Sequence, residues 1–120
     1  MLRGDVVLCR LPLPSTQLAQ FKLRPAVVIS KNANNRRLDD LIVAPCTSNT
    51  SRRKEPTQYV LEGAELASAG VVVPSAVRGE ALMTIPKTMV LRVLGHLSTS
   101  ALTAIDGCLK DALALLPVQG

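Results

Sequence analysis

The stretch Arg24-Pro25-Ala26-Val27-Val28-Ile29-Ser30 is the most informative part of the sequence. An uninterrupted apolar run of this length, bounded by polar residues, is typical of a strand that is buried on both faces. Two further apolar runs, residues 41–46 and 71–74, also end in polar groups: Thr47-Ser48-Asn49 follows the first, and Ser75-Ala76-Val77-Arg78-Gly79-Glu80 follows the second. We expect the ends of these strands to present a common site.

The chemistry of these strand ends suits a phosphate diester. Arginine matches phosphate in a bidentate manner, a hydroxyl can donate to a phosphate oxygen, and a carboxylate can accept a proton. The strand ends provide these groups in Arg24, Thr47 and the pair of Arg78 and Glu80. Alternate residues of a strand share a face, so that pair is expected to be neighbours.

Around these runs, the first two thirds of the chain predicts short strands between turns. The strands are expected at residues 4–11, 24–31, 40–46, 57–61, 71–78 and 83–97, the last broken by a turn at 85–87. Residues 32–37 predict a turn, and residues 64–69, closed by Gly70, predict one short helical turn. Strands at this spacing favour a small, twisted, mainly antiparallel sheet or partly closed barrel.

After residue 97 the spacing of the apolar residues changes to that of a helix. Ser98 is a plausible N-cap, and a helix is expected from about residue 99 to 115, with Gly107 lowering its intrinsic stability by about 1 kcal/mol. Its apolar stripe is expected to pack on the sheet and comprises Leu102, Ile105, Leu109, Ala112, Leu113 and Leu116.

Length and composition indicate one domain over residues 1–120, with 48% hydrophobic residues for its core. The net charge of +5 favours a polyanionic partner, although a basic surface can also serve solubility alone. One Phe, one Tyr and no Trp exclude a row of stacking aromatic residues, so nucleic-acid binding would depend on charge and backbone contacts.

The cysteines and the single histidine limit the classes of site. Cys9, Cys46 and Cys108 are odd in number and lack paired spacing, so neither a zinc site nor a disulfide framework is expected. No metal or other cofactor is predicted. Arg3 and Asp5 interrupt any signal peptide, and no stretch resembles a membrane span, which favours a cytoplasmic protein.

Five segments together resemble the MazF/PemK-type toxins of bacterial toxin–antitoxin systems, in order and spacing, over nearly the whole chain. They are Gly4-Asp5-Val6-Val7-Leu8, Lys22-Leu23-Arg24-Pro25-Ala26-Val27-Val28-Ile29-Ser30, Asp40-Leu41-Ile42-Val43-Ala44-Pro45-Cys46-Thr47-Ser48-Asn49, Pro74-Ser75-Ala76-Val77-Arg78 and Leu94-Gly95-His96-Leu97-Ser98. The resemblance implies an SH3-like barrel of twisted antiparallel strands with a C-terminal helix, and a homodimer. It also implies a metal-independent endoribonuclease that cuts single-stranded RNA, chiefly mRNA, by attack of the 2′-hydroxyl to give a 2′,3′-cyclic phosphate.

The resemblance places catalytic roles on Arg24 and Thr47. Arg24 matches the family's catalytic arginine, although from the residues alone an ion pair with Asp39 or Asp40 is the more ordinary role. Thr47 matches the family's catalytic threonine, although a hydroxyl at a strand end often bonds the local backbone of a turn.

Arg78 and Glu80 match an Arg-x-Asp pair of PemK-like members, in which the acid is proposed as the general base. This chain has Glu instead, one methylene longer, and MazF-like members lack the acid altogether. The alternative is a surface ion pair worth at most about 1 kcal/mol.

Residues beside the catalytic set are expected to bind RNA, with the basic ones following its backbone. These are Lys22, Ser48, Asn49, Arg52, Arg53, Lys54 and Ser75. An acidic, MazE-like segment of a cognate antitoxin would compete for the same surface, covering Arg24 and Arg78.

Other interpretations remain open at this stage. His96 can act in acid–base catalysis but is more often structural, and Cys46 can be a nucleophile but is more often a small buried hydrophobe. CcdB-like proteins share the fold and bind gyrase through the end of the C-terminal helix, where they carry a tryptophan that this chain lacks. The third interpretation is that the chain is a relative that binds RNA or a protein without cleaving RNA.

Overall fold

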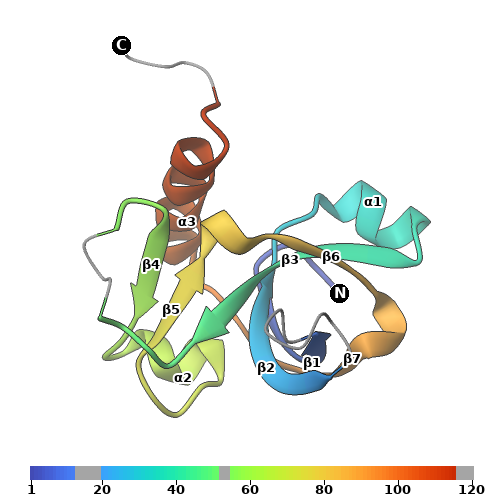
Figure 1. Cartoon of the computed structure of the whole chain (residues 1–120), viewed down its shortest axis with the longest axis horizontal. Coiled ribbons are helices and arrows are strands. Elements are labelled where there is room, and N and C mark those ends of the chain that lie inside the picture. The colour runs from blue at the N-terminus through green and yellow to red at the C-terminus, as the bar shows by residue number, and fades with distance from the viewer. Residues whose placement is uncertain (13–19, 52–54, 116–120) are drawn as a thin grey trace.

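The computed structural model describes residues 1–12, 20–51 and 55–115 (Figure 1). Over these residues it has seven strands: β1 (Asp5–Pro12), β2 (Phe21–Val28), β3 (Asp40–Thr47), β4 (Gln58–Leu61), β5 (Ser75–Arg78), β6 (Met83–Pro86) and β7 (Val90–His96). The helices are α1 (Asn32–Arg37), α2 (Glu65–Ala69) and α3 (Thr99–Ala112), with 3₁₀ turns η2 (Gly79–Ala81) and η3 (Lys87–Met89).

The strands form one twisted antiparallel sheet in the order β4-β5-β3-β2-β1-β7, with β6 paired to β3 beside this path. The two end strands of that order, β4 and β7, do not pair with each other, so the sheet is curved but not closed. The predicted mainly β fold with a C-terminal helix is confirmed.

Burial on both faces is also confirmed for residues 26–28 of β2. Ala26 and Val28 belong to one apolar cluster, which includes Cys9 and Val43, whereas Val27 belongs to the other. All three β2 residues have no exposed surface. Full burial of a Val side chain stabilises a fold by about 1.5–3 kcal/mol, so this run contributes to both halves of the core.

Helix α3 covers one side of the sheet next to β4 and η2. The predicted N-cap is confirmed, because the Ser98 hydroxyl accepts a hydrogen bond from Ala101 N at 3.2 Å. Ile105 and Leu109 of the expected stripe are buried, and so is Ala101, which the stripe omitted. The helix ends at Ala112 rather than 115, leaving Leu113 exposed, and Leu116 lies outside the described residues.

Two predictions about local structure are wrong. Residues 32–37 form helix α1 rather than a turn, because the buried amide of Asn35 bonds back to the carbonyl of Ser30 at 2.9 Å and stabilises the helical turn. Strand β5 begins only at Ser75, because residues 71–74 leave the sheet ahead of Pro74, which has no N–H to donate. The short helix closed by Gly70 is confirmed as α2.

The register of β2 and β3 creates an opening in the sheet. The two strands pair only where Ala26, Val27 and Val28 face Pro45, Ala44 and Val43. Beyond this point β3 pairs with β5, Cys46 facing Val77 and Thr47 facing Ala76. The beginning of β2 and the end of β3 therefore diverge. Arg24 in β2 and Thr47, the last residue of β3, lie on the two sides of this divergence.

Candidate functional site

Three of the four predicted catalytic residues line one cavity of about 270 Å³ at this divergence. Arg24 reaches it from β2, Thr47 is the last residue of β3, and Arg78 is the last residue of β5. The expectation that separate strand ends present a common site is met by these three residues.

Thr47 is the residue that connects the neighbouring cavities. It lines the 270 Å³ cavity, a cavity of about 390 Å³ that it shares with Arg24, and a polar cavity of about 260 Å³ that it shares with Arg78. Its Oγ1 accepts a hydrogen bond from Asn49 N at 3.2 Å, which is the local turn contact considered above. Because the hydroxyl accepts this bond, its own hydrogen is available to a ligand.

Arg24 makes no ion pair with any described residue, and the alternative of a pair with Asp39 or Asp40 is wrong. The antiparallel register explains this, because Asp40 faces Pro86 at the end of β3 farthest from Thr47. Arg24 is half-buried at the cavity, and no Asp or Glu is among the described residues that line it. This is the arrangement expected of a group that receives an anionic ligand.

Arg78 and Glu80 are neighbours, as predicted, but not because they alternate along a strand. Strand β5 ends at Arg78, and Glu80 lies in the 3₁₀ turn η2. Arg78 Nε donates to Glu80 Oε2 at 3.1 Å, Gln58 Nε2 donates to the same oxygen at 2.9 Å, and Thr57 Oγ1 donates to Oε1 at 3.2 Å. Glu80 lines none of the cavities described here.

These contacts set the ionisation of Glu80. Partial burial acts to raise its pKa, but hydrogen bonds from Gln58, its own backbone N–H and Arg78, together with the charge of Arg78, outweigh burial and lower the pKa below its ordinary value. The carboxylate is therefore ionised near neutral pH and holds Arg78 at the edge of the cavity.

The predicted RNA-binding residues fall into three groups. Lys22, Ser48 and Ser75 line the 390 Å³ cavity, although Ser75 donates its hydroxyl to Val73 O at 2.9 Å and is buried. Asn49 lines the polar cavity with Gln58. Arg52, Arg53 and Lys54 lie outside the described residues.

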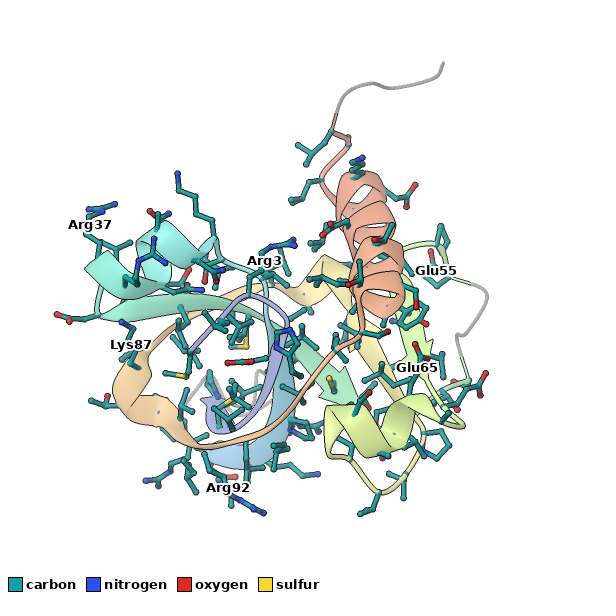
Figure 2. All side chains as sticks on the ribbon, turned by 180° about the vertical axis from the view of Figure 1, so that it is seen from behind. Arg3, Arg37, Glu55, Glu65, Lys87 and Arg92 are labelled. Carbon is teal, nitrogen blue, oxygen red and sulfur yellow. The ribbon has the colours of Figure 1, made fainter. Side chains whose placement is uncertain are left out.

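Sequence reasoning missed two further residues at these cavities. Arg92 projects from β7 (Figure 2) and lines the 390 Å³ cavity, and Gln58 holds Glu80 from β4. Arg92 interrupts an apolar strand, which was a weak signal that this face of β7 is exposed. Nothing in the sequence distinguished Gln58, because its role depends on its pairing with Arg78 across β4 and β5.

The contacts of His96 and the burial of Cys46 indicate structural roles for both residues. His96 Nδ1 lies 2.7 Å from Asp5 Oδ1, and the other oxygen of Asp5 accepts from Leu2 N, so the pair joins the N-terminus to β7. Burial and the neighbouring Cys9 raise the pKa of Cys46 to about 12, which keeps it a neutral thiol. The structural interpretation of both residues is confirmed.

Within the described part of the chain, no three His, Cys, Asp or Glu side chains are grouped so as to hold a metal ion. Across the same residues, no helix is both long and apolar enough to cross a membrane.

Comparison with known proteins gives a consistent result. Residues 2–113 match the model of the family described as "PemK-like, MazF-like toxin of type II toxin-antitoxin system". The chain is 29% identical to Endoribonuclease EndoA of Bacillus subtilis (strain 168) over 114 residues, which cover 95% of each protein.

Solved structures share the fold. An endoribonuclease from Mycobacterial species in complex with its cognate antitoxin has a TM-score of 0.75 at 23% identity, covering 96% of each chain. MazE-MazF (Form-III) from Deinococcus radiodurans has a TM-score of 0.72 at 18% identity, covering 96% of this chain and 97% of the other.

Proposed function

Because the chain belongs to the PemK-like, MazF-like toxins of type II toxin–antitoxin systems, we propose that it is an endoribonuclease that cuts single-stranded RNA, chiefly mRNA. The observation that carries this proposal is the cavity lined by Arg24, Thr47 and Arg78. No Asp or Glu is among the described residues that line it, so two guanidiniums and a hydroxyl face a space suited to one phosphate diester.

The proposed reaction is an internal transesterification. The ribose 2′-hydroxyl loses its proton and its oxygen attacks the adjacent phosphorus, while the bond from phosphorus to the 5′-oxygen breaks and that oxygen takes up a proton. The products are a 2′,3′-cyclic phosphate and a 5′-hydroxyl. Arg24 and Arg78 stabilise the additional negative charge on the phosphorus oxygens, and Thr47 donates to one of them. These groups supply the required positive charge without a metal ion.

For Glu80 we propose two contributions that experiment can separate. Its hydrogen bonds support a role in orienting Arg78, since both of its oxygens accept bonds from neighbouring side chains. Acceptance of the 2′-hydroxyl proton is the second role; because Glu80 lines none of the cavities, this role requires Oε1 to leave its 3.2 Å bond from Thr57 and turn toward the RNA.

The remaining site residues are proposed to hold the RNA on either side of the reacting phosphate. Lys22, Ser48 and Ser75 belong to the 390 Å³ cavity and Asn49 to the polar one. The basic residues 52–54 follow Asn49 in the sequence and are proposed to contact further phosphates. Binding through such contacts weakens steeply as salt is raised.

Family membership also supports a protein partner. We propose that an acidic segment of a cognate antitoxin covers Arg24 and Arg78, and that the toxin acts as a homodimer in the cytoplasm. Free thiols at Cys9, Cys46 and Cys108 support a reducing compartment.

The test is cleavage of a long single-stranded RNA by the purified protein in excess chelator. Arg24→Ala is expected to lower kcat/KM by about 10²–10³, whereas Arg36→Ala, which removes an exposed arginine from α1, should leave the rate unchanged. Intact RNA across several sequences would contradict the nuclease and leave a gyrase-binding or non-catalytic relative.

A further inference from the structure

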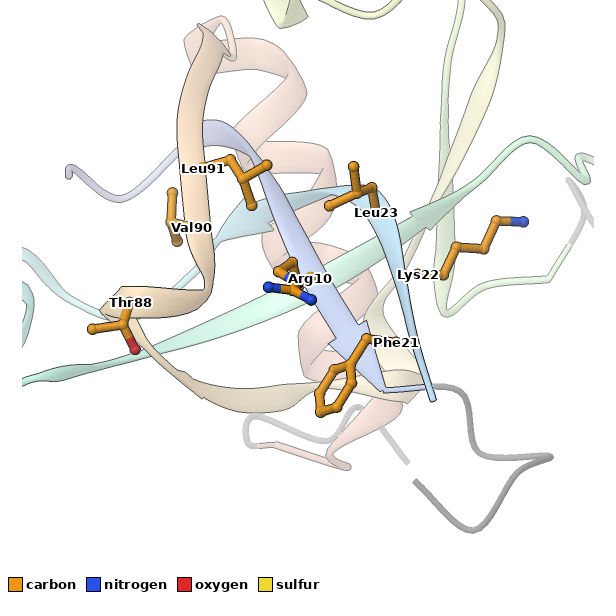
Figure 3. A pocket seen from close by; sticks show the side chains of 7 residues that line it. All are labelled: Arg10, Phe21, Lys22, Leu23, Thr88, Val90 and Leu91. Atoms are coloured by element: carbon orange, nitrogen blue, oxygen red, sulfur yellow. The ribbon is translucent and has the colours of Figure 1, made fainter. Parts of the chain in front are cut away.

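A cavity of about 450 Å³ lies next to the candidate site and has no role in the reaction proposed above (Figure 3). It is formed where the beginning of β2 and the end of β1 meet β7 and η3. The residues that line it are Arg10, Phe21, Lys22, Leu23, Thr88, Val90 and Leu91.

The only phenylalanine of the chain lies in this cavity. Phe21 begins β2, faces Pro12 of β1, and is 48% exposed. Folding normally buries a side chain of this kind, and an aromatic ring left open beside basic residues indicates a binding surface. Leu23 and Leu91 of the same cavity are about half exposed as well.

The cavity continues into the candidate site. Lys22 and Leu23 line both this cavity and the 390 Å³ cavity that contains Arg24 and Thr47. Phe21 and Arg24 are three residues apart on β2, so their backbones lie about 10 Å apart at the rise of an extended strand while their side chains leave opposite faces of it. The continuity between the two cavities therefore runs around the open edge of β2 at Lys22 and Leu23.

The charges around both cavities favour a polyanion. Arg10 and Lys22 line the first cavity and Arg92 lines the second, and none of these cations makes an ion pair with another described residue. No Asp or Glu is among the described residues that line either cavity.

We propose that this cavity binds an unstacked nucleobase of the RNA strand whose phosphate is held by Arg24 and Thr47. The base stacks on the ring of Phe21, and Arg10 and Lys22 contact the flanking phosphates. This inference rests on the proposed function and assigns a second subsite to the same substrate. The positive charges of Arg10 and Lys22 favour a polyanion over a second copy of this basic chain as the occupant of the cavity.

Binding of RNA that cannot be cut tests the inference without depending on cleavage. We would measure fluorescence anisotropy of a labelled oligonucleotide that is 2′-O-methylated throughout. Phe21→Ala is expected to weaken binding by about tenfold, within the range for loss of one stacked base. The matched control Leu38→Ala removes an apolar side chain of similar exposure at the end of α1 and should bind normally.

A second variant guards against a merely structural effect of the alanine. The chain has no tryptophan, so Phe21→Trp introduces a single indole that reports on this cavity. We expect Phe21→Trp to bind RNA as well as the native protein, with its fluorescence quenched on binding. One abasic position in the oligonucleotide should remove the quenching.

The outcomes separate the inference from the proposed function. Unchanged affinity of Phe21→Ala together with unquenched Phe21→Trp overturns the subsite, while continued RNA cleavage by the native protein leaves the nuclease intact. Indole fluorescence that changes with protein concentration in the absence of RNA also overturns the subsite, in favour of a contact between copies. If the native protein neither binds nor cuts RNA, the proposed function itself fails.

Discussion

Arg78 Nε donates to Glu80 Oε2 across 3.1 Å, and this bond leaves the two terminal nitrogens of the guanidinium for a ligand. Arg78 lines the cavity that Arg24 and Thr47 also line, so the carboxylate holds one edge of the guanidinium beside the position proposed for the phosphate. The charge-assisted bond thus serves to orient the arginine.

The first prediction concerns pH. The pKa of Glu80 is lowered below its ordinary value of 4.5, so its ion pair is present above that pH and is lost as the pH falls through the lowered value. The acid limb of kcat/KM for RNA cleavage is therefore expected below pH 4.5, and Glu80→Gln should abolish that limb. Circular dichroism at each pH checks that the fold persists. A limb at or above 4.5 would show that another group governs the acid side.

The second prediction concerns the residues that hold Glu80. Gln58 is only 9% exposed and donates to Oε2, so Gln58→Leu removes a bond that lowers the pKa of Glu80. The acid limb should move to higher pH, and kcat should fall by roughly tenfold with little change in KM. Thr57→Val is expected to act in the same direction, whereas Thr57→Ser keeps the hydroxyl and should behave as the native protein. If both threonine variants behave alike, the hydroxyl has no role.

The third prediction contrasts two glycines by thermal unfolding. Gly70 has φ +75° as the cap of α2, and a Cβ there would lie 2.1 Å from the backbone oxygen of Leu94. Gly70→Ala is therefore expected to destabilise the fold by about 2 kcal/mol or more. Gly107→Ala, in α3 with no atom within 4 Å, should instead stabilise it by about 1 kcal/mol. Equal effects at both positions would contradict the close packing of α2 on β7.

The fourth prediction concerns Arg92. If it contacts an RNA phosphate, Arg92→Ala lowers the slope of log K against log salt for single-stranded RNA by about 0.7. Arg36→Ala, the control in α1, should leave the slope unchanged. An unaltered slope for Arg92→Ala would remove it from the RNA surface.

Part of the fold could be predicted from the sequence, but the shape of the site could not. The buried strand at Ala26 and the cap at Ser98 could be predicted because they depend on local pattern and hydrogen bonding. The cavity that contains Arg24 depends on the residue at which β3 stops pairing with β2, while its last two residues pair with β5. Only the family resemblance indicated which strand ends would meet at this cavity.

Two of the predictions that were wrong failed for different reasons. Residues 32–37 look like a turn, but the bond from Asn35 to Ser30 turns them into a helix. The pairing of Asp40 with Pro86 removed the expected partner of Arg24. The first is a side-chain bond between residues five apart, and the second is the pairing of two separate strands; neither can be seen in the hydrophobic pattern of the chain.

The most decisive measurement uses an RNA that contains one cleavage sequence, mapped first with the native protein, and the same RNA with a single 2′-deoxyribose at the nucleotide 5′ to the cut. We expect cleavage of the all-ribose RNA in excess chelator, with 2′,3′-cyclic phosphate and 5′-hydroxyl ends, and no cleavage at the substituted position. Continued cutting of the substituted RNA would show that the 2′-hydroxyl is not the nucleophile and would contradict the transesterification proposed for Arg24, Thr47 and Arg78.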